Sequence, residues 1–249
     1  MKLIKEMFMG LHKSALFSCF IHVTALVSIT GCASIEEFPN TEVKNISKYK
    51  THQNQNGISI AIDLFHEEAR LKQFFGTDLL SYGYLPVNVI IKNTANQFLL
   101  VERGNFSLLD VDKGEVVDIS PSSAGSPFKK KLSDLQDLAT INTMLTLSIL
   151  SLPNIILQPY EAHIRGVMQN INAKALYDRS ISYNELHHGF IYLDLKKMDF
   201  SNNDVILKIN IKNLTTGETH AFFFGINAAN TGGRIKQIKN KLEGIKDET

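Results

Sequence analysis

Three side chains that commonly bind zinc lie within four positions of one another: Glu185, His187 and His188. Imidazole nitrogens and carboxylates are suitable ligands, so this cluster is the strongest candidate for a metal site. On a strand, however, successive side chains point to opposite faces. His187 and His188 would therefore diverge, while Glu185 shares a face with His187. This spacing favours a polar loop that enters a strand, and we predict no metal here.

The other short motifs are also explained by turns. Asp110, Asp112 and Gly114 have the spacing that opens a calcium loop, but Pro121 stands where the final glutamate of that loop is required. The sequence contains no phosphate-binding glycine loop, no dinucleotide fingerprint and no G-x-S-x-G motif. We therefore predict no catalytic residue, no metal and no cofactor. An enzyme whose side chains come from scattered positions remains an alternative.

A β-rich domain at residues 57–228 is expected to position these side chains. Ile58, Ile60 and Ile62 alternate with smaller or polar residues, which is typical of a half-buried strand. Similar apolar patterns predict further strands at 85–93, 98–101, 106–111, 116–119, 181–183, 189–195, 205–211 and 219–224. This number of short strands separated by turn residues predicts a mainly β fold, an immunoglobulin-like β-sandwich.

A helical insertion is expected at residues 130–178, with helices at 131–152 and 160–177 separated at Pro153. Residues 138–157 are uncharged and long enough to cross a bilayer, but their polar side chains and the proline favour packing instead. The packing surface could be the sandwich, a partner protein or a membrane. Four residues are candidates for this hydrophobic interaction: Leu145, Leu147, Ile149 and Leu150.

The first 31 residues are expected to be a secretory signal, because a lysine-containing start precedes an uncharged run from Ser14 to Ile29. The run ends in Ile29-Thr30-Gly31-Cys32, the lipobox pattern of bacterial lipoproteins. The small or β-branched residues suit the signal peptidase, and the thiol of Cys32 receives the lipid. We therefore predict cleavage before Cys32 and lipidation at that residue.

The segment after the signal predicts the location of the mature protein. Residues 32–56 are polar and lack an apolar period, so the lipidated cysteine and a flexible tether are expected here. Ala33, in the position where aspartate retains enterobacterial lipoproteins in the inner membrane, favours the outer membrane, facing the periplasm. Removal of the signal, which carries three lysines and one glutamate, changes the formal net charge from +1 to about −1. That balance argues against a nucleic-acid partner.

A basic amphipathic tail is expected at residues 229–249, with its apolar side formed by Ile235, Ile238, Leu242 and Ile245. The plain interpretation is a solvated helix face. Contact with anionic lipid or a partner groove is the alternative.

Three segments resemble a group of uncharacterised bacterial lipoproteins: FFGTDLLSYGYLPVNVIIKN, AKALYDRSIS and HHGFIYLDL. The resemblance covers residues 57–225 and implies a β-sandwich whose closing strand follows a helical insertion. Its motifs are structural and imply no active site.

The function expected from these observations is that of a membrane-anchored envelope lipoprotein, a non-enzymatic protein-binding or structural module. Its partners would be the membrane, through the lipid, and an envelope protein. A carrier of small hydrophobic ligands or lipids is the first alternative, and an unrecognised periplasmic enzyme is the second. The sequence does not separate the binding module from the carrier.

Overall fold

Two antiparallel sheets and three α-helices make up the part of the chain that the computed structural model describes, which is residues 38–110, 116–119, 124–145, 152–197, 205–226, 233–235 and 237–238. The fold there is mixed α and β, whereas the sequence pattern predicted a mainly β fold. The difference arises because helices pack on a sheet as part of the core. Four 3-10 helices connect the larger elements, at Ile46–Lys48, Leu79–Tyr82, Arg103–Asn105 and Leu195–Lys197.

The four-stranded sheet has the order β1-β2-β3-β8, with every neighbouring pair antiparallel. Its strands are β1 (Thr51–Gln55), β2 (Ile58–Leu64), β3 (Tyr84–Asn93) and β8 (Leu186–Asp194). Asn56 and Gly57 join β1 to β2, and both have positive φ angles, 52° and 76°. An Asn-Gly pair with this geometry is the preferred two-residue hairpin turn.

The six-stranded sheet is organised around β9 (Val205–Asn213). β10 (Thr219–Ile226) follows one edge of β9, while β4 (Leu99–Val101) and β5 (Phe106–Asp110) share the other edge. Two short strands complete the sheet, β6 (Val116–Asp118) beside β5 and β7 (Arg179–Ile181) beside β4. The regular alternation of buried and more exposed residues along β9 confirms the predicted period-two pattern.

One buried apolar cluster includes residues from both sheets, among them Ile60, Val89 and Ile191 of the four-stranded sheet and Leu99 and Ile209 of the six-stranded sheet. This shared core covers one face of each sheet. β3 and β8 differ from β9, because buried residues follow one another without alternation, over Tyr84–Ile91 in β3 and Gly189–Leu193 in β8. Both faces of these two strands must therefore be covered.

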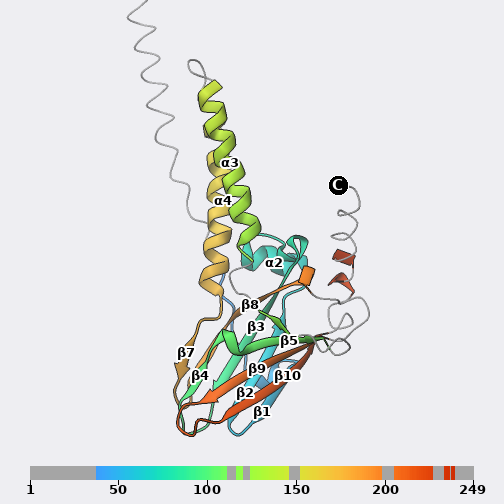
Figure 1. Ribbon diagram of the computed structural model, residues 1–249, viewed down its shortest axis with the longest axis vertical. Helices are drawn as coiled ribbons and strands as arrows, with labels where there is room; N and C mark the ends of the chain where they lie inside the picture. The colour runs from blue at the N-terminus through green and yellow to red at the C-terminus, as the bar shows by residue number, and fades with distance from the viewer. Residues whose placement is uncertain are drawn as a thin grey trace, which may run out of the picture. The chain divides into compact units, whose positions relative to one another are not determined.

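Helix α2 (Glu68–Phe75) and helix α4 (Leu152–Lys174) cover the face of β3 and β8 that points away from the six-stranded sheet (Figure 1). Phe190 of β8 meets Phe65 and Phe75 edge to face, with ring centroids 4.8 and 5.0 Å apart. The hydroxyl of Tyr192, on the same face of β8 as Phe190, donates a 2.7 Å hydrogen bond to the carbonyl of Ile171 in α4. These contacts fix the C-terminal end of α4 against β8.

Helix α3 (Ser126–Leu145) packs along α4, as Figure 1 shows. Two helices thus lie between β6 and β7, and their bounds differ from the predicted 131–152 and 160–177. α4 already begins at Leu152, because Pro153 occupies the first turn, where its missing N–H is not needed. Pro159 also lies inside α4. Among the described residues, no helix is long and apolar enough to cross a membrane.

The chain before β1 is folded from Phe38 onward, so the predicted tether to residue 56 is wrong over that stretch. Ile46 is buried against Ile90 on the helix-covered side of the four-stranded sheet. The ring of Phe38 lies directly over Gly76, which has a φ of 73° and ends α2. At the other end of the chain, Ile235 is fully buried and belongs to the shared core.

Asn88, in the middle of β3, provides a stability prediction. Its side chain is fully buried, and neither amide atom has a hydrogen-bond partner among the described residues. Asn88→Leu should raise the free energy of unfolding by about 1–2 kcal/mol, because it removes two unsatisfied polar atoms. Denaturant unfolding measures this change. Asn93→Leu is the matched control and should be destabilising, since the Asn93 amide donates to Gln97 and Ile181 carbonyls. A loss of stability in Asn88→Leu would contradict the prediction.

Candidate binding cleft at the edge of the four-stranded sheet

A cleft of about 420 Å³ lies along the outer edge of β8 and is called the edge cleft below. One wall is the start of β8, and the other is the chain that leaves α4 and leads to β7. Asn40 and Thr41 of the N-terminal segment complete it. The lining residues are Asn40, Thr41, Ala173, Lys174, Ala175, Tyr177, Arg179, Leu186, His187, His188, Gly189 and Phe190.

Gly189 allows the two walls to meet at one end of the edge cleft. Ala175 forms a parallel bridge with Phe190, and the Leu176 amide donates a 2.8 Å hydrogen bond to the Phe190 carbonyl. A Cβ at Gly189 would lie 2.5 Å from Cα of Leu176. Only glycine permits this approach of two backbones. The contact closes the edge of β8 at Phe190 and leaves the preceding residues open.

The histidine pair lies in this cleft, on two sides of one strand. His187 is paired with Ile91 and His188 with Ile90 in the β3–β8 register, so their side chains point to opposite faces as predicted. The carboxylate of Glu185 turns away toward Arg179 and the amide of Ser182. No group of three metal-binding side chains gathers anywhere in the described residues.

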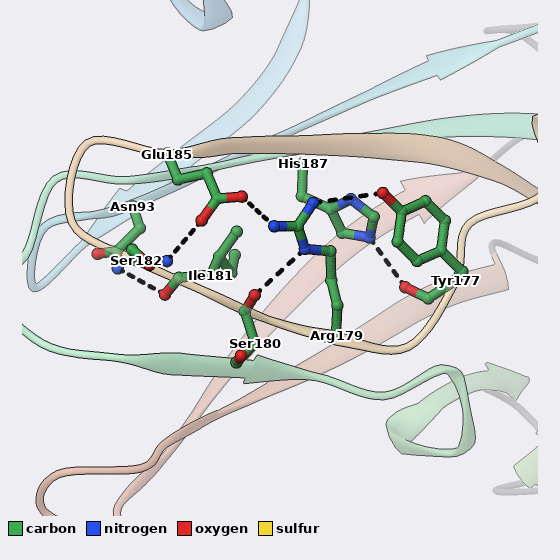
Figure 2. A network of polar contacts seen from close by, with 8 residues as sticks. All are labelled: Asn93, Tyr177, Arg179, Ser180, Ile181, Ser182, Glu185 and His187. Atoms are coloured by element: carbon green, nitrogen blue, oxygen red, sulfur yellow. Dashed lines mark hydrogen bonds and ion pairs between the residues drawn. The ribbon is translucent and has the colours of Figure 1, made fainter.

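Arg179, which lines the cleft, and Glu185 form the centre of a polar network (Figure 2). The guanidinium pairs with the Glu185 carboxylate and also donates to the Tyr177 hydroxyl at 3.3 Å and the Ser180 carbonyl at 3.2 Å. The backbone hydrogen bond from Ser182, followed by the charge of Arg179, lowers the pKa of Glu185. Arg179 is therefore charge-compensated and holds the β7–β8 turn in place.

His187 is almost fully buried beside this network. Its Nε2 lies 2.9 Å from the Tyr177 carbonyl, and its ring meets the Tyr177 ring edge to face at 4.7 Å. The side chain thus ties the segment after α4 to β8. Tyr177 itself remains 53% exposed at the mouth of the edge cleft.

Lys174 reaches the cleft from the last turn of α4. Its Nζ donates to the Phe74 carbonyl at 2.9 Å, the Asn170 side-chain oxygen at 2.5 Å and the Phe38 carbonyl at 3.5 Å. These partners are all neutral oxygens, and no described carboxylate forms an ion pair with this ammonium group. Desolvation lowers the pKa of Lys174. The edge cleft therefore contains a partly buried ammonium group without a described counter-charge.

The histidines make stability depend on pH. Burial lowers the pKa of both His187 and His188 below the ordinary value of 6.5, because the charged form is poorly solvated. The unfolded chain then binds protons at a higher pH than the folded chain. Their contribution to stability should be present above pH 6.5 and lost as pH falls through the lowered pKa values. Urea midpoints at pH 7.5 and 5 measure this loss, and His187→Asn with His188→Asn should reduce it. An unchanged pH dependence in the double variant would contradict this assignment.

Most of the other residues singled out by sequence lie outside the described residues. The lipobox, Ile29, Thr30, Gly31 and Cys32, lies outside the described residues. So do Leu147, Ile149 and Leu150, whereas Leu145 ends α3 and its side chain is not described. The calcium-like spacing also falls largely outside, since only Asp110 is within a described strand.

Sequence reasoning did not identify Lys174, Tyr177 or Arg179 as cleft residues. The AKALYDRSIS stretch contains all three. Its two basic residues and one tyrosine close together were the available signal. Comparisons with protein-family models, with curated proteins and with solved structures found no match.

Proposed function

We propose that this chain is a lipid-anchored protein of the bacterial envelope whose domain binds another protein through the edge cleft. The anchor is inferred from Ile29-Thr30-Gly31-Cys32, which follows the apolar run of a signal sequence. We further propose that the domain is an immunoglobulin-like β-sandwich with a helical insertion, the fold of the lipoproteins it resembles. Two antiparallel sheets with a common core support that assignment.

The observation that carries the binding function is the edge cleft beside exposed apolar side chains. Tyr177 is 53% exposed and Leu186 is 37% exposed, and both line the cleft. Aromatic and apolar groups around a polar cleft provide contact area together with directional hydrogen bonds, the combination found in protein interfaces. The cleft lining is too polar to favour a carrier of apolar ligands, because it includes Lys174, Arg179 and both histidines.

Photo-crosslinking in intact cells tests the proposal. A photoreactive amino acid at Tyr177 should give a discrete adduct with one protein, while the same group at Phe223, an exposed aromatic position on β10, should not. Cys32→Ala should remove labelling by an acyl analogue and weaken the Tyr177 adduct, because the chain would no longer be held at the membrane.

A different result would contradict each of the two parts of the proposal, the binding cleft and the lipid anchor. Equal adducts from Tyr177 and Phe223 would overturn protein binding through the cleft. Acyl labelling that persists in Cys32→Ala would overturn the lipid anchor. These two results are independent, so one part can fail while the other stands.

A further inference from the structure

The free edge of β8 is the first observation. In an antiparallel pair, the N–H and C=O of one residue point to the same side, and this side alternates along the strand. The Phe190 carbonyl accepts from Leu176 and therefore points away from β3. By the same alternation the backbone groups of Leu186 and His188 also point away from β3. Outside the β3–β8 pairing, neither residue has a backbone hydrogen bond to another described residue.

This open stretch of β8 is short and lies inside the edge cleft, since Leu186 and His188 both line it. Pairing with an added strand has to stop at Phe190, whose carbonyl is already occupied by Leu176. Unpaired backbone groups at a sheet edge are a template for another extended chain. The geometry thus fits a short extended segment of a few residues rather than a long added strand.

The ammonium group of Lys174 is the second, independent observation. It lines the same cleft, is partly buried, and has only neutral oxygens as described partners. A desolvated cation is stabilised most by a nearby carboxylate. The other cation in the cleft, Arg179, already pairs with Glu185, so Lys174 is the basic group that an incoming anion would meet. Its three N–H donors all have partners, and a carboxylate would replace the longest of these contacts, the 3.5 Å one to the Phe38 carbonyl.

We propose that the edge cleft binds an extended peptide segment with an acidic side chain, whose backbone pairs with Leu186 and His188 and whose carboxylate pairs with Lys174. This inference rests on the proposed protein-binding function and specifies the class of partner. Leu186 and Tyr177 contact the neighbouring side chains of the bound segment. His188, which has no hydrogen bond to another described residue, supplies a further polar contact.

Fluorescence anisotropy with the full-length chain in detergent tests the proposal, using short labelled peptides of alternating valine and glutamate. We expect saturable binding at least about tenfold tighter than that of the matching valine–lysine peptide, a difference of about 1.4 kcal/mol. An extended peptide has two alternating sets of backbone amides, and only one set can face β8. N-methylation of that set should reduce binding, because it removes the donors that pair with β8, whereas N-methylation of the other set should not.

Lys174→Met, which keeps an unbranched side chain of similar length, should weaken binding of the acidic peptide by about tenfold or more. Lys212→Met is the matched control, since Lys212 is exposed on β9 and does not line the edge cleft. A melting curve checks that both variants are folded. If Lys174→Met does not fold, the two peptide comparisons with the unaltered chain still decide the question.

Equal affinity for the acidic and basic peptides would overturn the charge preference, and indifference to N-methylation of both sets of amides would overturn strand pairing. Binding that occurs only after Glu36→Gln and Glu37→Gln would also overturn the proposal, because it would assign the cleft to the chain's own acidic segment. A Tyr177 adduct in cells without acidic-peptide binding would leave protein binding intact and refute only this choice of partner.

Discussion

Replacing Gly189 with alanine is expected to lower the free energy of unfolding by about 3 kcal/mol, because the added methyl group meets backbone atoms instead of a movable side chain. The new Cβ would lie 2.5 Å from Cα of Leu176 and 2.7 Å from its amide nitrogen. Leu176 cannot move away without losing its 2.8 Å hydrogen bond to the Phe190 carbonyl. Denaturant unfolding followed by circular dichroism measures the difference between the variant and the unaltered chain.

Gly225→Ala is the matched control for this change. Gly225 also lies on a strand, β10, but apart from its two chain neighbours no described residue has an atom within 4 Å of the position that its Cβ would occupy. Alanine there should leave stability unchanged or raise it by up to about 1 kcal/mol, because glycine is unfavourable inside a strand. A Gly189→Ala variant as stable as the Gly225→Ala variant would disprove the close approach that forms the end of the edge cleft.

Strands were predictable where burial on one face imposes a period of two. The alternation of Val205, Leu207 and Ile209 along β9 is an example, and it predicted the observed element. β3 and β8 were also recognisable from sequence, and their continuous apolar runs differ from the alternating pattern of β9. Such runs indicate burial on both faces, and here the covering elements are α2, α4 and the segment before β1.

β1 was missed because an edge strand needs no apolar pattern. Its residues, THQNQ, are polar and mostly exposed, so their composition alone predicts a tether. Asn56-Gly57 was the available signal, since this pair favours the positive φ angles of a tight hairpin. A hairpin turn joins two strands, so this pair predicts a strand before β2 even though the residues there are polar.

The candidate site was only partly predictable, because its important features depend on distant segments. The opposite directions of His187 and His188 follow from strand geometry alone. The partial burial of the Lys174 ammonium group among neutral oxygens does not follow from local sequence, since its Nζ contacts the carbonyl of Phe74, a hundred positions earlier in the chain. The free edge of β8 depends likewise on where α4 ends and how Leu176 pairs with Phe190. Neither relation leaves a local pattern in the sequence.

Replacing Phe190 with alanine is expected to cost about 4 kcal/mol of unfolding free energy, because it opens a cavity between the four-stranded sheet and α2. The Phe190 ring is 1% exposed and meets the rings of Phe65 and Phe75 edge to face. It therefore joins β8 to α2 and to the chain that precedes α2. Calorimetry or denaturant unfolding measures the loss, which should be accompanied by weaker near-ultraviolet dichroism from the aromatic cluster.

Phe223→Ala is the matched control, because Phe223 is 48% exposed on β10, with Nζ of Lys208 5.9 Å from its ring centroid. Its removal should cost about 1 kcal/mol or less, since little apolar area returns to water. Equal costs at Phe190 and Phe223 would contradict the packing of α2 on β8. A large loss at Phe190 alone would show that the wall of the edge cleft is held by the core behind it. Binding variants therefore belong on the exposed side of that wall, at Tyr177, where a change in affinity can be separated from a change in folding; a variant at the partly buried Lys174 needs the melting curve beside it.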